Sequence, residues 1–400
     1  MFDNNNKKRV FITGFGIISA IGCGEDEVFN ALLRKQSVIG KVSFLETELK
    51  NYPVAEIKQS NDDLARRAAL PDNKIYSRSF LLGIIAVQQA MKMAGIQTTE
   101  GILSATSVGG VDVKERFYKK IIYNNAYPQL KHEAFPWLEI AHCAEHIAKY
   151  FNIRTNVTTI SSACASSANS IMVGSRLVRN GVVNSILVGG MDALSLFSLN
   201  GFNSLEILSP TGCRPFDKHH NGITIGEGAA YLVLEAEQAA KGKKIYGEIV
   251  GYANRNEAFH QTSPSPDGAG IAMTMQDALS VAAIPPRDID YINAHGTGTV
   301  VNDLAEGKAI GMVFGNNIPP VSSTKGFTGH TLAAAGAIEA VLSLLCLKHQ
   351  TFLPNLGWEE KIEELPFIPH NEMNKANINY VLSNSLGFGG ANSTLIIKKV

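Results

Sequence analysis

Cys164 stands where an apolar stretch gives way to a helix of small residues. The stretch ends at Ile160, and the small-residue helix is expected to run from Ala165 to Val178. A thiol there would meet the partial positive charge and free N–H groups of a helix N-terminus, which favour a thiolate and can hold an oxyanion. A lone cysteine is more often a buried structural residue, so this position needs support from other residues.

Two histidines supply that support. His295 follows the apolar stretch Ile289–Ala294, and open α/β sheets bind their ligands at the carboxyl ends of strands. His330 ends the segment Ser322–His330 and opens a second small-residue helix, from Thr331 to Leu347. Either histidine alone could be a core residue. Together, beside a cysteine at a helix start, they indicate nucleophilic catalysis.

Phe388 lies in a glycine-rich turn near the C-terminus. Gly387, Gly389 and Gly390 surround it within the segment Asn384–Asn392. Glycines let a backbone approach another group closely, and a bulky side chain among them can swing or seal an opening. A plain turn between two strands is the simpler alternative.

The elements that must position these residues alternate between short apolar strands and longer helices, which predicts an α/β fold. The first 240 residues and the last 160 share one order of elements: an opening strand, then a small-residue helix, then a strand that ends in glycine. The opening strands lie in Lys8–Gly14 and Lys244–Gly251, and the later ones in Ile186–Gly190 and Tyr380–Gly387. We therefore expect two similar halves whose sheets enclose the small-residue helices, with Cys164 facing His330.

Composition excludes several classes of protein. The 36 basic and 36 acidic residues balance, so the electrostatic footprint of nucleic-acid binding is absent. A 45% hydrophobic content with 18% charge indicates a folded chain. The five scattered cysteines contain no C-x-x-C pair, which predicts reduced thiols in the cytoplasm rather than disulfides or a zinc ribbon. The apolar run Leu332–Leu347 contains Glu339, so no membrane span is expected.

Three weaker signals have plainer interpretations. Basic residues 7 to 9 and the apolar stretch before Cys23 imitate a lipoprotein signal, but glycines interrupt the stretch and Val10–Thr13 is typical of a buried strand. His142 and His146 have a spacing that could ligate zinc, although a solvated helix face is expected instead.

The third signal is a pair of carboxylates after His295. Asp303 and Glu306 could bind a cation near the site or could cap the following helix, and the cap is the preferred interpretation.

Four motifs in this order resemble those of the β-ketoacyl-acyl-carrier-protein synthases of the thiolase superfamily, nearest the elongating type I/II enzymes. The resemblance extends from Arg9 to Ile397. The motifs are Ser162-Ala163-Cys164-Ala165-Ser166-Ser167, Asn293-Ala294-His295-Gly296-Thr297-Gly298-Thr299, Lys325-Gly326-Phe327-Thr328-Gly329-His330 and Gly387-Phe388-Gly389-Gly390. The loop Cys213-Arg214-Pro215-Phe216-Asp217 is also similar, and in the family it lies near the entrance.

The resemblance implies a duplicated, five-layered αβαβα fold and a homodimer. Residues 1–240 would form the half that carries the nucleophilic cysteine, and residues 241–400 the half that carries both histidines. It also implies a decarboxylating Claisen condensation, in which an acyl group on the cysteine is lengthened by two carbons from malonyl-acyl carrier protein. The implied partner is acyl carrier protein with acyl and malonyl thioesters, and no cofactor or metal is implied.

The resemblance also implies a role for each motif residue. Cys164 would be the nucleophile, and His295 and His330 would donate hydrogen bonds to the enolate. The N–H groups of Cys164 and Phe388 would form the oxyanion hole, and Phe388 would be the gate. Lys325 is implied as a fourth catalytic residue, which supports the geometry of the histidines. The implied supporting residues are Glu339, Thr297, Thr299, Gly387 and Gly389.

Alternatives remain within and beyond this family. A thiolase acting on CoA esters uses a second cysteine near the C-terminal glycine loop, where this chain has Phe388 and no cysteine. A chain-length-factor partner subunit lacks the nucleophile, and such a subunit could replace one half of the homodimer. Asp112, near the expected acyl pocket, departs from the apolar run of long-chain elongating enzymes. Fatty-acid intermediates and polyene-type unsaturated chains both remain open as substrates.

Overall fold

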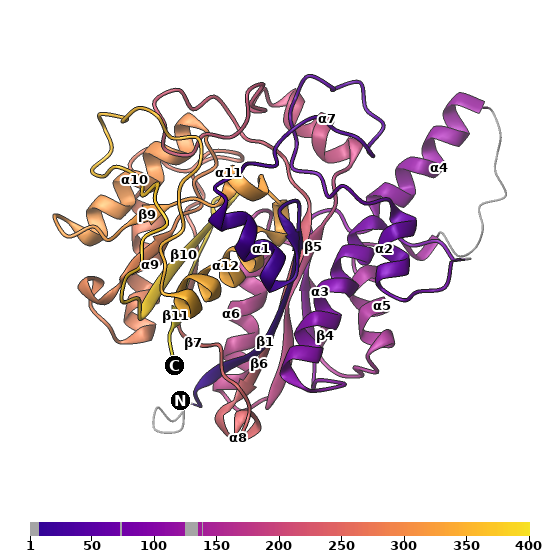
Figure 1. Ribbon diagram of the computed structural model, residues 1–400, viewed down its shortest axis with the longest axis horizontal. Coiled ribbons are helices and arrows are strands. Elements are labelled where there is room, and N and C mark those ends of the chain that lie inside the picture. The colour runs from indigo at the N-terminus through magenta and orange to yellow at the C-terminus, as the bar shows by residue number, and fades with distance from the viewer. Residues whose placement is uncertain (1–7, 73, 125–134, 138) are drawn as a thin grey trace.

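The computed structural model describes residues 8–72, 74–124, 135–137 and 139–400, so Lys7 of the signal-like segment lies outside the described residues (Figure 1). The strands are β1 (Val10–Ser19), β2 (Gly22–Cys23), β3 (Ile102–Ala105), β4 (Val157–Ile160), β5 (Ser185–Asp192), β6 (Gly228–Ala236), β7 (Gly247–Asn256), β8 (Tyr291–Asn293), β9 (Val321–Ser322), β10 (Tyr380–Gly387) and β11 (Ala391–Lys398). The helices are α1 (Glu25–Leu33), α2 (Asn61–Arg67), α3 (Arg78–Ala94), α4 (Val111–Asn124), α5 (His142–Tyr150), α6 (Ser166–Arg179), α7 (Leu196–Ser204), α8 (Glu237–Ala240), α9 (Ala269–Ala282), α10 (Val300–Phe314), α11 (Lys325–Thr328) and α12 (Ala335–His349).

The strands form two groups with the same internal order. The first is β4-β3-β5-β6-β1 and the second is β9-β8-β10-β11-β7. In each group the first three strands are parallel and the last two are added antiparallel. The groups join where β1 pairs with β7, through Phe11 with Glu248 and Ile12 with Gly247. The duplicated α/β architecture expected from the sequence is confirmed.

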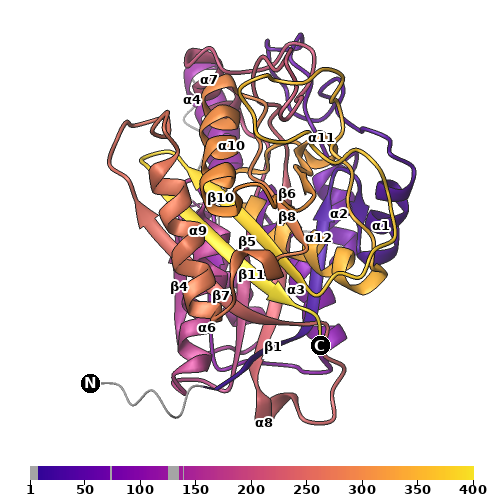
Figure 2. The ribbon, with the colours of Figure 1, turned by 90° about the vertical axis from the view of Figure 1, so that its left-hand side faces the viewer.

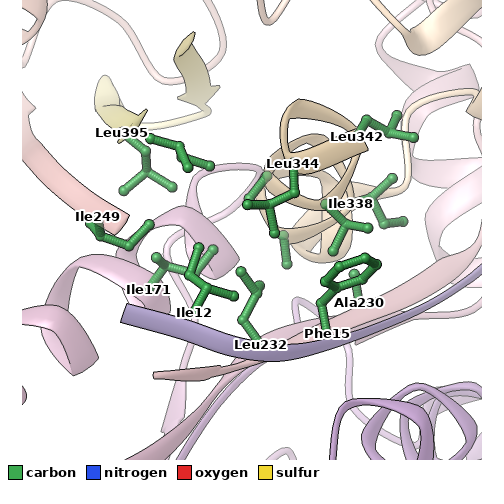
Figure 3. Packing of buried hydrophobic residues seen from close by; sticks show 14 of the residues in the cluster. Ile12, Phe15, Ile171, Ala230, Leu232, Ile249, Ile338, Leu342, Leu344 and Leu395 are labelled. Carbon is green, nitrogen blue, oxygen red and sulfur yellow. The ribbon is translucent and has the colours of Figure 1, made fainter. Parts of the chain in front are cut away.

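Helices separate and cover the two groups of strands (Figures 1 and 2). Helix α3 packs on β1 and β6, α9 packs on β7 and β11, and α6 and α12 contact each other between the sheets. The central core contains Ile12, Phe15 and Leu232 from the first sheet, Ile338 from α12 and Leu395 from the second sheet (Figure 3). The layers therefore follow the order α, β, α, β, α.

Helix α12 is the most apolar of the helices in the described part of the chain. The segment Leu332–His349 is long and apolar enough to cross a membrane, and no other helix in the described part of the chain is both. However, 89% of this segment is buried inside the protein. Helix α12 is therefore a core helix, as expected from Glu339 in its middle.

Strand β1 is buried along its whole length, as Val10–Thr13 predicted. Its two glycines explain why the apolar stretch is interrupted. A Cβ atom at Gly14 would lie 2.3 Å from the carbonyl oxygen of Ala90, and one at Gly16 would lie 2.0 Å from that of Ala86. Glycine is required here because the backbone of α3 lies directly on the strand.

Candidate active site

Cys164 sits on a tight turn between β4 and α6. Ala163 has a φ of +50°, a left-handed conformation that few residues other than glycine adopt. The Ser166 hydroxyl accepts a hydrogen bond from the Ser162 N–H at 2.8 Å and donates to the carbonyl oxygen of Ala163, which ties the turn together. The turn places Cys164 just before the first residue of α6, at 6% exposure.

Burial raises the pKa of the Cys164 thiol to about 11. The positive charge of Lys325 and a hydrogen bond from the Phe388 N–H oppose this rise. The direction of this pKa shift is opposite to the thiolate that a helix start favours, because burial penalises the charged form. The resting form of Cys164 is therefore the thiol.

His295 follows the end of β8, as expected. Its backbone N–H and that of Gly296 each donate to Glu306 at 2.8 Å. Its Nδ1 atom lies 3.3 Å from the Lys325 Nζ. An ammonium group can only donate, so Nδ1 accepts and the ring proton is on Nε2. His330 lies beside it, with ring centroids 5.2 Å apart and planes at 85°.

Lys325 is a buried cation behind the two histidines. Its ammonium also donates to the carbonyl oxygen of His295 and to Glu339. Burial raises the pKa of Glu339 to about 7, and Lys325 opposes the rise. Since an unpaired buried charge is costly, Lys325 and Glu339 hold each other in place.

Both histidines are neutral. Burial lowers the pKa of His295 and of His330 well below the usual value, and the nearby Lys325 charge lowers both further. A neutral imidazole carries one N–H donor and one acceptor, so each ring can donate one hydrogen bond.

Two cavities meet at the cysteine. One of about 160 Å³ is lined by Cys164, His295 and His330, together with Thr297, Thr299, Gly387 and Phe388. The other, of about 360 Å³, is lined by Cys164, Ser107, Val108 and Phe202 among others. Phe388 lines both cavities, and its ring centroid lies 5.7 Å from that of Phe202.

Gly389 is next to Phe388 but belongs to the turn rather than to a cavity wall. Its φ is +81°, its N–H donates to the Gln261 carbonyl oxygen at 2.7 Å, and its carbonyl oxygen accepts from Asn256 at 2.7 Å. The loop that follows β7 therefore anchors the turn that carries Phe388.

The structure corrects the interpretation of Asp303 and Glu306. The first turn of α10 has no side-chain cap. Glu306 instead accepts from the N–H groups of His295 and Gly296, and Asp303 accepts from those of Phe216 and Gly298. Both carboxylates point back from the helix and hold the loop before it.

Asp112 and the histidine pair also differ from expectation. Ser107 and Val108 line the cavity beside Cys164, but Asp112 lines a separate cavity of about 300 Å³ and accepts a hydrogen bond from the backbone N–H of Arg78 at 3.0 Å.

His142 and His146 do not form a solvated face. They pack in an aromatic cluster, with the His146 ring centroid 4.8 Å from Phe80 and 5.4 Å from Trp137.

Sequence reasoning missed several residues that line the two cavities. They have no motif of their own, because they come from the loop after β7 and from α7 and α10; they are Phe202, Leu205, Glu257, Thr262 and Asn302. The one available signal was polarity, since Glu257 and Thr262 follow a buried strand.

Comparison with known proteins identifies the family. Residues 7–240 match the Beta-ketoacyl synthase, N-terminal domain, and residues 246–359 match the Beta-ketoacyl synthase, C-terminal domain. The chain belongs to the β-ketoacyl synthase family. It is an acyltransferase of the thiolase superfamily, as the four motifs indicated.

Full-length relatives of this β-ketoacyl synthase include 3-oxoacyl-[acyl-carrier-protein] synthase 2 of Staphylococcus aureus, which is 34% identical over 99% of both chains. Among solved structures, the ishigamide ketosynthase/chain length factor has a TM-score of 0.92 at 28% identity, over 98% of this chain and all of that one. The ketosynthase ApeO in complex with its chain length factor ApeC from Xenorhabdus doucetiae has a TM-score of 0.86 at 30% identity, over all of both chains.

Proposed function

We propose that this synthase joins an acyl group held on Cys164 to the two-carbon unit of a malonyl thioester on acyl carrier protein. The product is a 3-oxoacyl thioester longer by two carbons. One observation carries the assignment of residues: Cys164, His295 and His330 line a single cavity, with the buried Lys325 behind them.

The first step transfers the acyl group. The Cys164 sulfur bonds to the carbonyl carbon of the acyl thioester, and the bond to the carrier sulfur breaks. Because the resting group is a thiol, its proton must leave during the attack, and it ends on the departing carrier thiol. The Lys325 charge and the Phe388 N–H assist by stabilising the developing thiolate.

The second step uses the two histidines. A malonyl thioester loses its carboxylate as carbon dioxide, and the electron pair of the broken bond forms an enolate. Its oxygen accepts hydrogen bonds from the ring N–H groups of neutral His295 and His330. The enolate carbon attacks the acyl carbonyl, the Cys164 sulfur leaves as thiolate, and solvent supplies one proton to it.

Phe388 has two roles in this proposal. Its N–H, with that of Cys164, stabilises the oxyanion formed on the acyl carbonyl oxygen. Its side chain is the gate between the cavity that receives the carrier arm and the cavity that receives the acyl chain, since it lines both. Gly387 lets β10 pass close to the Cys164 turn, since an added Cβ would lie 3.0 Å from the Ser162 carbonyl oxygen, and the hydrogen bonds of Gly389 anchor the turn. Thr297 and Thr299 line the arm side.

We also propose that the chain works as a cytoplasmic homodimer, with halves 1–240 and 241–400. Strand β4 supports the dimer, because it ends the sheet, and Val157 at its start is 37% exposed. A heterodimer with a chain length factor is the second arrangement, as in the solved ApeO–ApeC complex. Sedimentation of the purified chain alone distinguishes them: two copies support the homodimer, and a monomer contradicts it.

A chain-length-factor role for this chain itself is disfavoured by the presence of Cys164, His295 and His330. The deciding experiment is the intact mass of the protein after incubation with acyl-carrier-protein thioesters of different length and unsaturation. An acyl adduct on the parent protein that is absent from Cys164→Ala supports the synthase. No adduct from any thioester would refute it, and the mass of the preferred adduct identifies the acyl class.

A further inference from the structure

Asp303 ties together two loops at the mouth of the active-site cavity. Its Oδ2 atom accepts the Phe216 N–H at 2.7 Å, and its Oδ1 atom accepts the Gly298 N–H at 3.2 Å. Asp303 is fully buried. Phe216 has a φ of +57°, which is unfavourable for a bulky residue. The carboxylate therefore anchors a backbone that would not keep this conformation alone.

His220 is a further donor to that carboxylate. Its Nδ1 atom lies 3.1 Å from the Asp303 Oδ2, and its side chain is only 6% exposed. A carboxylate accepts hydrogen bonds, so Nδ1 of His220 carries the proton. The adjacent His219 points outward instead: its side chain is 57% exposed and lies 3.1 Å from Glu360.

The loop held in this way faces the substrate cavity. Thr297 and Thr299 line this cavity. The loop is held further by a hydrogen bond of 2.9 Å, which the Gly222 N–H donates to the Gly298 carbonyl oxygen. The catalytic His295 is fixed separately, through Glu306 and Lys325. Loosening Asp303 would therefore move the cavity wall at Thr297–Thr299 more than the histidine that meets the enolate.

We infer that His220 is a positioning residue, which through Asp303 fixes the Thr297–Thr299 wall against the incoming carrier-bound thioester. This inference rests on the proposed function. Loss of the Nδ1 hydrogen bond should raise KM for the carrier-borne substrate by about tenfold, the effect of one hydrogen bond to a charged group. The value of kcat should change by less than about twofold, because His295 keeps its own anchors.

The test compares three variants with the parent enzyme. His220→Ala removes the donor, His220→Asn keeps an N–H donor near the position of Nδ1, and His219→Ala is the matched control at the next residue. Initial rates of carbon dioxide release are measured against the concentration of malonyl-acyl carrier protein. The acyl donor is the thioester that gives the largest adduct in the mass experiment. The rate of Cys164 alkylation by iodoacetamide reports whether each variant keeps a folded site.

The expected result is a raised KM in His220→Ala, largely restored in His220→Asn and unchanged in His219→Ala, with normal alkylation in all three. An unchanged KM in His220→Ala would overturn the inference. So would a fall in kcat alone, or a KM in His220→Asn as high as in His220→Ala. If His220→Ala does not fold, His220→Phe, which keeps a ring but lacks the Nδ1 donor, takes its place: a raised KM supports the inference, and an unchanged KM overturns it. A parent enzyme that releases no carbon dioxide would instead overturn the proposed function.

Discussion

The Cβ atom of Ala168 in α6 lies 2.8 Å from the point where a side chain on Gly336 of α12 would begin. The Ser385 hydroxyl oxygen of β10 is equally close to that point. The two central helices thus meet backbone to backbone, and only a residue without a side chain fits between them.

Gly336→Ala should therefore lower the free energy of unfolding by about 1–3 kcal/mol, the usual cost of overpacking a core. Chemical denaturation measures it. Gly201→Ala is the matched control, because Gly201 lies in α7 with no heavy atom within 4 Å of an added Cβ, and alanine favours a helix. Equal stability of Gly336→Ala and the parent would show that the helices can separate without cost.

The rate of Cys164 alkylation should rise about tenfold per pH unit from about pH 7 to about pH 9, with no plateau. The reason is that burial raises the pKa of the thiol to about 11, so only a small fraction is thiolate in this range. Iodoacetamide labelling followed by intact mass measures the rate, with Cys164→Ala as the control for labelling of the other cysteines, such as the partly exposed Cys23. A plateau near neutral pH would mean that Lys325 and the helix start outweigh burial.

His330→Ala should still accept an acyl group on Cys164 but should decarboxylate malonyl thioesters about 10²–10³-fold more slowly, the usual cost of one lost donor to an oxyanion. Carbon dioxide release measures the second step, and intact mass measures the first. The same acyl adduct in variant and parent shows that the site is folded. Normal decarboxylation by the variant would rule out the enolate role of His330.

The free energy of unfolding should decrease as the pH is lowered from about 6.5 toward 4. Protonation of His146 in the unfolded chain should account for part of this decrease. Burial lowers its pKa to about 4, so in this range the unfolded chain binds a proton that the folded chain does not. Since His146 is half-buried, its share stays below about 1.4 kcal/mol per pH unit, the limit for one proton.

Denaturation at several pH values tests this share. His146→Phe keeps an aromatic ring in the cluster and should flatten the pH slope of stability. The exposed His260, changed to Phe, serves as the control and should leave the slope as in the parent. An identical slope in His146→Phe and the parent would contradict the assignment.

The fold could be predicted largely from the sequence, because the two halves share one order of strands and small-residue helices. A helix of small residues such as Ala165–Val178 fits between two layers. The strand after it, β5, contains Gly189 and Gly190 but continues to Asp192, whereas β10 ends at Gly387 as expected. The candidate residues Cys164, His295 and His330 stood out in the sequence because each follows a strand or precedes a helix, and the structure places the three around one cavity.

The electrostatics and the long-range partners could not be predicted. A helix start favours a thiolate, but the pKa of Cys164 depends on its burial and on residues far away in the chain, such as Lys325 and Phe388, whose interactions lower it. Asp303 and Glu306 resemble helix caps because they lie near a helix start, whereas their partners precede the helix. His220 gave no signal, because its partner Asp303 lies 83 positions away.

The two ends of the sheet differ in one respect that governs how copies of the chain can associate. At one end, β4 is followed by no further strand among the described residues, and its first two residues are exposed. At the other end, β9 consists of two buried residues, and the His370 backbone N–H already donates a hydrogen bond of 2.7 Å to the Val321 carbonyl oxygen. A sheet with one open edge can be extended once by its own copy, and each edge then covers the other. In the proposed homodimer, association through β4 would therefore be self-limiting and would end in a closed pair rather than a filament.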